Sequence, residues 1–337
     1  MSSKDFATSF FPVFTSFVSS SELAPSFLVN AWNSIFPDDN CGLPLQQSNI
    51  IPNRPCLAVT AILGAYIGLK LTKYKTTVIR KDSNNCRGEL FHEIYFTWSQ
   101  ATKYFGYMNV VALLHHCFFP PPTSYDNNLR RYMDNTLWAL DCFFTCVSSA
   151  QLIILTCLIY NLYTLKDNDT TLNSIIYTIQ KIRFWVVEVL SITITILSIM
   201  LQYYIVGSDD ISFSMIVKNS VTIELCYLFP LQIAAMLLLP LFIARVCNIY
   251  KAHDDESING ILITLFGGVV IGASLPLDSR LCSWISTHAP YIKESALLYD
   301  MFHMPTILFL GCNISFVGLS MWINSITQQH QQKDKSK

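Results

Sequence analysis

Charged side chains are scarce in this chain. Of its 337 residues, 13% are charged and 52% are apolar, whereas about a quarter of a soluble protein is charged. Lysine and arginine nearly balance aspartate and glutamate, 22 against 23, so the chain lacks the basic surface that nucleic-acid binding requires. It also lacks a glycine-rich phosphate loop, which argues against a nucleotide enzyme. Much of the chain is therefore expected to lie out of water.

The eleven cysteines include no CxxC pair, which argues against a zinc ribbon. Several lie inside apolar runs, where a thiol is usually a small hydrophobic side chain. Cys41, Cys56, Cys117 and Cys282 fall in outside-facing segments of the topology argued below. One disulfide could form among these four cysteines, and the sequence does not indicate which two would pair.

Long apolar segments predict an all-α protein, a polytopic membrane protein with a bundle of seven transmembrane helices. A hydrocarbon core about 30 Å thick is crossed by about 20 residues of helix. Seven windows meet or approach this length: 55–73, 94–119, 136–163, 182–206, 219–248, 258–276 and 298–325. Glycines at 260, 267, 268 and 272 predict that another helix approaches the sixth window closely.

Lysine and arginine in the loops set the orientation. Fourteen lie on one side and seven on the other, and the richer side is expected to be cytosolic. This predicts an integral membrane protein of the secretory pathway or cell surface, with an outside or luminal N-terminus and a cytosolic C-terminus. Residues 1–54 form the outer segment, 55–325 the membrane domain and 326–337 a disordered cytosolic tail. An apolar face over 23–36 predicts an interfacial helix or, alternatively, one packed over the bundle mouth.

Ionisable residues inside the windows are expected to be paired or functional. Lys103 and Glu188 lie at similar depth in the cytosolic half, which predicts a buried ion pair. The outer half carries a larger group of residues with metal-ligand chemistry: His115, His116, Asp134, Asp141, Asp300 and His303. Imidazoles and carboxylates at one level suit Zn²⁺. Two alternatives need no metal, namely histidines lying in the interface and a structural hydrogen bond between Asp141 and His303.

This arrangement resembles the CREST superfamily, which contains alkaline ceramidases, progestin and adiponectin receptors, and lipid-remodelling enzymes that process GPI anchors. The likeness rests on "RRYMDNTLWALDCFF" in the third window, "LLYDMFHMPTILFLG" in the seventh and "LPLDSRLCSW" before it. Together with "CGLPLQQSNIIPN" before the first window, the seventh-window text also resembles the transmembrane protein 187 group. The resemblance implies a seven-span bundle and, in many members, a zinc-dependent lipid amide or ester hydrolase.

Several positions depart from the family pattern. Val111 and Ala112 stand where the resemblance implies a Ser, and Tyr299 stands where it implies a His. His115 or His116, Asp141 (or Asp134) and His303 match, as metal ligands. The sequence thus predicts a protein whose partners are membrane lipids, either a lipid-binding member that has lost the chemistry or a metal-dependent lipid hydrolase. A receptor or transporter of unrelated seven-helix architecture is the alternative.

The topology makes a direct prediction about glycosylation. Asn168-Asp169-Thr170 is an acceptor sequence for N-linked sugar, and the charge distribution places it in the cytosol. Asn168 should therefore carry no glycan when the chain is made in eukaryotic cells, as measured by endoglycosidase treatment and peptide mass spectrometry. Sugar on Asn168 would invert the predicted topology.

Overall fold

The computed structural model describes residues 54–71, 86–118, 128–164, 171–190, 192, 193, 196, 255–288, 300–302 and 304–335. Every element within these residues is helical, as the sequence predicted. The α-helices are α4 (Pro55–Leu71), α5 (Cys86–Leu113), α6 (Asn128–Thr164), α7 (Thr171–Ile182), α10 (Asp255–His288) and α13 (Met304–Lys335). Two π-helices continue α5 and α7, namely η3 (Leu114–Phe118) and η4 (Arg183–Leu190).

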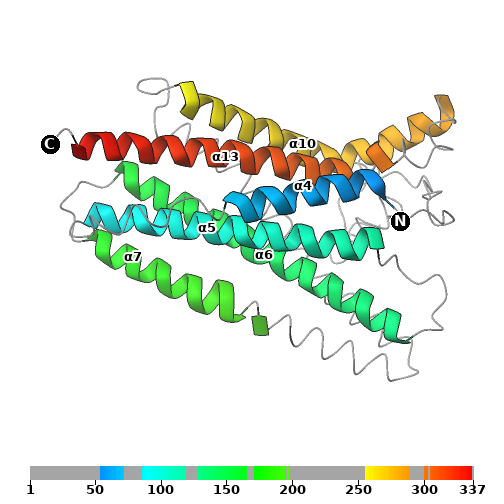
Figure 1. Ribbon diagram of the computed structural model, residues 1–337, viewed down its shortest axis with the longest axis horizontal. Coiled ribbons are helices and arrows are strands. Elements are labelled where there is room, and N and C mark those ends of the chain that lie inside the picture. Colours follow the sequence, from blue (N-terminus) through cyan, green and yellow to red (C-terminus); the bar gives the residue numbers. More distant parts are fainter. Residues whose placement is uncertain are drawn as a thin grey trace, which may run out of the picture.

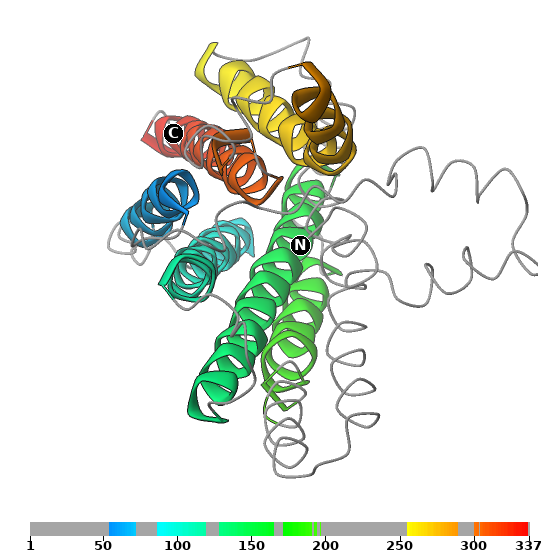
Figure 2. The ribbon, with the colours of Figure 1, turned by 90° about the vertical axis from the view of Figure 1, so that its right-hand side faces the viewer.

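The helices lie side by side along the long axis of the molecule (Figure 1). The most extensive contact joins α10 to α13, followed by α5 with α6, α4 with α5, and α13 with α4. Seen from the end of the bundle, α4 lies beside α5 and α13 (Figure 2). The core between them is aromatic at its centre, where Phe316 of α13 stacks on Phe105 of α5 at a centroid distance of 3.9 Å.

Glycines bring α10 and α13 into backbone contact, along a line that we call the glycine seam. A Cβ atom on Gly267 would lie 2.6 Å from Ser315 N, and one on Gly260 would lie 2.7 Å from Trp322 N. On the opposite helix, a Cβ on Gly318 would lie 2.5 Å from Thr264 N. Real Cβ atoms do not come this close, so only glycine allows the two helices to pack here. The close approach predicted for the sixth window is thereby confirmed at two of its four glycines.

A second glycine seam joins α4 to its neighbours. Gly68 faces Gly106 of α5, and Gly64 faces the side chains of Asn109 and Asn313. The amide nitrogens of these asparagines donate to Phe105 O (2.8 Å) and to Thr60 O (2.9 Å), so both Oδ1 atoms point at Gly64. Neither oxygen accepts a conventional hydrogen bond, and the Cα–H groups of a glycine are the weak donors available at such a contact.

The described helices correspond to the first, second, third, sixth and seventh predicted windows, and η4 corresponds to the start of the fourth. Two segments, Ala139–Leu162 in α6 and Pro305–Ile326 in α13, are long and apolar enough to cross a membrane. Pro55–Lys70 and Ile258–Ala273 are shorter apolar helices. The fifth window, most of the fourth and the outer segment 1–53 lie outside the described residues.

Two helices run beyond their predicted ends. α10 passes through Pro276 and continues to His288, and its direction changes along its length in Figure 1. Proline removes one hydrogen bond and bends a helix, but a bend does not always end it. α13 continues to Lys335, so the tail predicted to be disordered is helical over 326–335. Glutamine and lysine are good helix formers, and extending a formed helix avoids the cost of nucleation.

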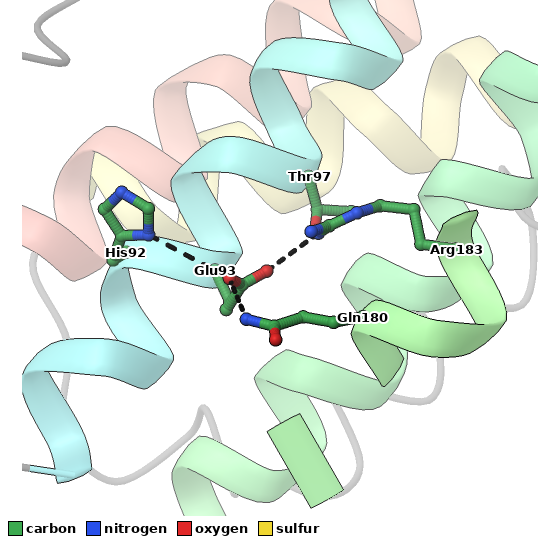
Figure 3. Close-up of polar contacts among 5 residues, drawn as sticks. All are labelled: His92, Glu93, Thr97, Gln180 and Arg183. Carbon is green, nitrogen blue, oxygen red and sulfur yellow. Dashed lines mark hydrogen bonds and ion pairs between the residues drawn. The ribbon is translucent and has the colours of Figure 1, made fainter. Parts of the chain in front are cut away.

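A buried ion pair joins α5 to the start of η4 (Figure 3). Arg183 Nη1 lies 2.7 Å from Glu93 Oε2, and Gln180 Nε2 donates to Glu93 Oε1 at 2.7 Å. The guanidinium also lies 4.4 Å from the ring centroid of Phe96. We call Glu93, Gln180 and Arg183 the polar clamp. It satisfies a carboxylate that is almost completely buried.

The ion pair predicted between Lys103 and Glu188 is not among those that the described residues form. The Lys103 amine lies over the ring of Tyr107 instead. The prediction paired only residues inside the windows, and Glu93 stands one residue before the second window.

The glycine seam predicts a large effect from one methyl group. Gly267→Ala should lower the free energy of unfolding by about 2 kcal/mol, the usual cost of overpacking, because the new Cβ meets backbone atoms of α13. The matched control is Gly272→Ala on the exposed side of α10, which should be neutral or slightly stabilising. Thermal unfolding in detergent measures both, and equal effects would contradict the seam.

The polar clamp predicts that removing its buried cation destabilises the protein far more than removing a nearby exposed one. Arg183→Leu should destabilise the protein by about 3–5 kcal/mol, because it leaves the Glu93 carboxylate buried without its cation. Lys181→Gln, two residues earlier and exposed, should change stability by less than about 0.5 kcal/mol. In a double-mutant cycle, the pair Glu93→Gln and Arg183→Leu should be non-additive. Additive losses would mean that the contact carries no coupling.

Candidate metal centre

The π-helix η3 turns two consecutive histidines toward each other. In an α-helix, neighbouring side chains diverge by about 100°. A π turn closes over five residues instead of four, which narrows that angle. The rings of His115 and His116 accordingly lie with their centroids 4.5 Å apart. His115 is buried and His116 is one quarter exposed, so both imidazoles lie at the edge of the packed interior.

Asp141 of α6 completes a three-residue group with these histidines. His116 Nε2 lies 3.5 Å from Asp141 Oδ2, and one ligand atom from each of the three residues lies within 4.8 Å of the others. The Asp141 side chain is 17% exposed, so the group is accessible without lying on the open surface. The extensive packing of α6 on α5 holds the carboxylate opposite the imidazoles.

This donor set fits Zn²⁺. Ligand atoms around one tetrahedral zinc lie roughly 3–3.5 Å apart, because each bond to nitrogen or oxygen is about 2.0–2.2 Å long. The spacing between His116 and Asp141 already meets this requirement. The whole group is wider, with its ligand atoms within 4.8 Å of one another, so metal binding would require the ligands to draw closer. Two imidazoles and one carboxylate leave a fourth position for water or substrate, as catalytic zinc sites do.

Asp300 serves a different purpose, as the cap of α4. Its Oδ2 accepts hydrogen bonds from Cys56 N at 2.7 Å and from Leu57 N at 3.2 Å. These are orphan amides of the first turn of α4, which begins at Pro55. Arg54 precedes that turn, and arginine is not a residue that caps a helix start. The carboxylate of a distant segment therefore takes the place of the missing local cap.

Four segments meet at this end of the bundle. Arg54, before α4, interacts electrostatically with Asp300, and α4 contacts η3. The group also includes Asp141 of α6 and thus joins the ends of the first, second, third and last predicted windows. In Figure 1 the start of α4, the end of α5 and the start of α13 lie at the same end of the molecule.

The structure thus brings together three of the predicted ligands. His115, His116 and Asp141 converge, and Asp300 lies at the same end but binds backbone amides. His303 and the side chain of Asp134 lie outside the described residues. Sequence reasoning missed Arg54 as part of this group. The available signal was a helix that starts with proline and has no serine, threonine, asparagine or aspartate before it.

Comparison of the chain with protein-family models, curated proteins and solved structures finds no significant match. The assignment of the centre therefore rests on its residues and their geometry.

Substitution of Asp300 distinguishes a helix cap from a metal ligand. Asp300→Ala should lower the free energy of unfolding by about 1–3 kcal/mol, since two buried amides lose their acceptor. It should leave the zinc content of the purified protein unchanged. Asp300→Asn keeps an acceptor oxygen and should lose less stability. Thermal unfolding and metal analysis test this, and loss of zinc in a folded Asp300→Ala protein would make Asp300 a ligand.

Proposed function

We propose that this chain is a seven-span membrane protein that binds Zn²⁺ through His115, His116 and Asp141 and hydrolyses an amide or ester bond of a membrane lipid. The observation that carries the proposal is the convergence of two imidazoles and a carboxylate from two helices. An ion pair between His116 and Asp141 would account for two of the three groups without a metal. A shared cation would account for all three.

The lipid-facing surface supports the membrane part of the proposal. Large apolar side chains are exposed along α10, where Leu262, Phe266 and Val269 are each more than half exposed. Val59 and Ile62 are similarly exposed on α4. In water such stripes would be a liability, whereas in a bilayer they are the expected surface of a span.

The two polar groups of the bundle are separated by a membrane's thickness. His115 follows Glu93 by 22 residues on α5 and η3, which corresponds to about 33 Å of helix. A bilayer core is about 30 Å thick. The candidate metal centre and the polar clamp would therefore lie at opposite faces of the membrane. The charge distribution of the loops favours the outer or luminal face for the metal centre.

A zinc ion at this site would lower the pKa of bound water to about 7 and supply hydroxide at neutral pH. His115, His116 and Asp141 would hold the ion, and the buried side chains around them would keep other water away. Cys117, the residue after His116, is fully buried and belongs to those side chains. The substrate would reach the site from the bilayer, because the apolar helix faces open to lipid.

A second candidate, lipid binding without hydrolysis, is favoured by the turn before the histidines. The family resemblance implies a serine four residues before the metal-binding histidine. Counting back from His115 and His116, these positions hold Val111 and Ala112. Both side chains are buried and apolar. They can neither bind a substrate carbonyl nor orient water. A protein with this turn would keep the metal as a structural or lipid-anchoring element.

Metal analysis tests the proposal directly. The full chain purified in detergent should contain about one zinc per molecule, and His116→Ala and Asp141→Ala should each lower zinc affinity at least about tenfold. His92→Ala, an exposed histidine at the other end of α5, is the matched control and should keep its zinc. Zinc should also raise the unfolding temperature of the wild type but not of Asp141→Ala.

Turnover then separates the two candidates. Purified protein is incubated with vesicles that contain lipids with amide or ester bonds, with and without chelator. Zinc-dependent release of fatty acid, lost in Asp141→Ala, would support hydrolysis. Bound zinc with no release would leave lipid binding as the function. Absence of zinc from the wild type and no thermal stabilisation by it would overturn both.

A further inference from the structure

One face of α7 and η4 carries a lysine between two exposed aromatic side chains. Tyr177, Lys181 and Trp185 are spaced four residues apart, and the two rings are exposed by 58% and 62%. Side chains at this spacing lie on one face of a helix. The opposite face holds buried Ile176 and Arg183 of the polar clamp. The face with the tyrosine, lysine and tryptophan is therefore turned away from the bundle.

Lys181 carries the net positive charge of this face. Its amine lies 4.5 Å from the ring centroid of Tyr177, and no ion pair formed within the described residues involves it. Arg183, the other cation of α7 and η4, is neutralised by Glu93. The acidic residue of these two helices, Glu188, lies about 10 Å farther along the axis. The face thus offers an anion one charge and a neighbouring tyrosine hydroxyl.

The polar clamp lies at the edge of the apolar layer, by a measure that is independent of the metal centre. Asn109 of α5 and Asn313 of α13 both meet Gly64, so they lie at one level. α13 ends where α5 begins (Figure 1). The apolar segment of α13 stops at Ile326, 13 residues beyond Asn313, and Glu93 lies 16 residues from Asn109 in the same direction. At 1.5 Å per residue, the clamp lies about 5 Å beyond the apolar segment.

The clamp also fixes the depth of the side chains along α7 and η4. α7 begins beside the start of α5 and runs toward the middle of the bundle (Figure 1). Lys181 therefore lies about 3 Å farther out than Arg183, and Trp185 about 3 Å farther in. Ile192 and Ile196 follow Trp185 at the spacing of one helix face and are exposed by 45% and 51%. From the edge inward, the order is tyrosine and lysine, then tryptophan, then aliphatic side chains.

We propose that this face binds one anionic phospholipid in the leaflet beside the polar clamp, which the predicted topology makes the cytosolic leaflet. The inference rests on the membrane embedding in the proposed function but not on the metal. The Lys181 amine and the Tyr177 hydroxyl donate to the phosphate, and the Trp185 N–H donates to an ester carbonyl. The acyl chains lie along Ile192 and Ile196. Tryptophan and tyrosine collect at the interface, and a lysine keeps its amine among the headgroups.

Lipid retention measures this binding. The full chain is reconstituted in phosphatidylcholine vesicles with phosphatidylserine as the minor lipid, and native mass spectrometry counts the lipids of each kind that stay bound. The wild type should retain phosphatidylserine above its share. Lys181→Gln should lower that preference about fivefold, the factor equivalent to about 1 kcal/mol per lysine near a membrane surface. Trp185→Leu should instead lower the retention of both lipids alike, because both carry the ester carbonyl that the indole binds.

Two controls make the result specific. Lys181→Arg keeps the charge and should keep the preference. Lys70 also lies beside a tyrosine, 2.6 Å from the Tyr66 hydroxyl, but the contact of Gly68 with Gly106 places it about 15 Å inward of the polar clamp. Lys70→Gln should therefore change the preference much less than Lys181→Gln. An equal loss in both variants, or an unchanged preference in Lys181→Gln, would overturn the lipid site.

Failure of this inference is distinguishable from failure of the proposed function. If alkaline carbonate extracts the chain from vesicles, it is not embedded in the bilayer and the lipid site falls with the membrane proposal. If the chain stays embedded and shows no preference for phosphatidylserine, the lipid site alone is wrong. The zinc content of the same sample reports separately on the metal centre.

Discussion

The fold depends on how closely its helix backbones can approach one another. At Gly260, Gly267 and Gly318, α10 and α13 are so near that a single methyl group would meet backbone atoms. In the bilayer that the proposed function implies, helices gain little from burying apolar surface, because the lipid is equally apolar. Contact between backbones would then supply the packing that the solvent cannot drive. The same device at Gly64 and Gly68 fixes α4 against α5.

That approach determines where the polar groups can be. α4 is held beside both α5 and α13, so the start of α4 comes within reach of Asp300, which precedes α13. The end of α5 is then placed beside the same turn, and η3 presents its histidines to α6. Polar contacts are thus concentrated at the two ends of the bundle. Between them, buried asparagine, serine and threonine side chains bond to backbone carbonyls across or along helices, as Ser148 does to Ala101 O at 3.0 Å.

Sequence reasoning predicted the features that depend on one element at a time. Apolar windows located the helices, and small residues located a close helix contact. It also grouped His115, His116 and Asp141, because the windows place them at one level. It failed where the outcome depends on partners from distant segments. Glu93 pairs with Arg183, Lys103 lies over Tyr107, and Asp300 caps a helix instead of facing a metal.

The bond from Asp300 to Cys56 joins residues 244 positions apart. A chain is synthesised from its N-terminus, so α4 is made long before the carboxylate that completes its first turn. Until the last helix arrives, two amides of α4 have no acceptor from that segment. A chain truncated before Asp300 therefore lacks the side chain that completes the first turn of α4. Completion of the C-terminal helix would act as an assembly checkpoint, and unfinished molecules would differ from finished ones at the start of the chain.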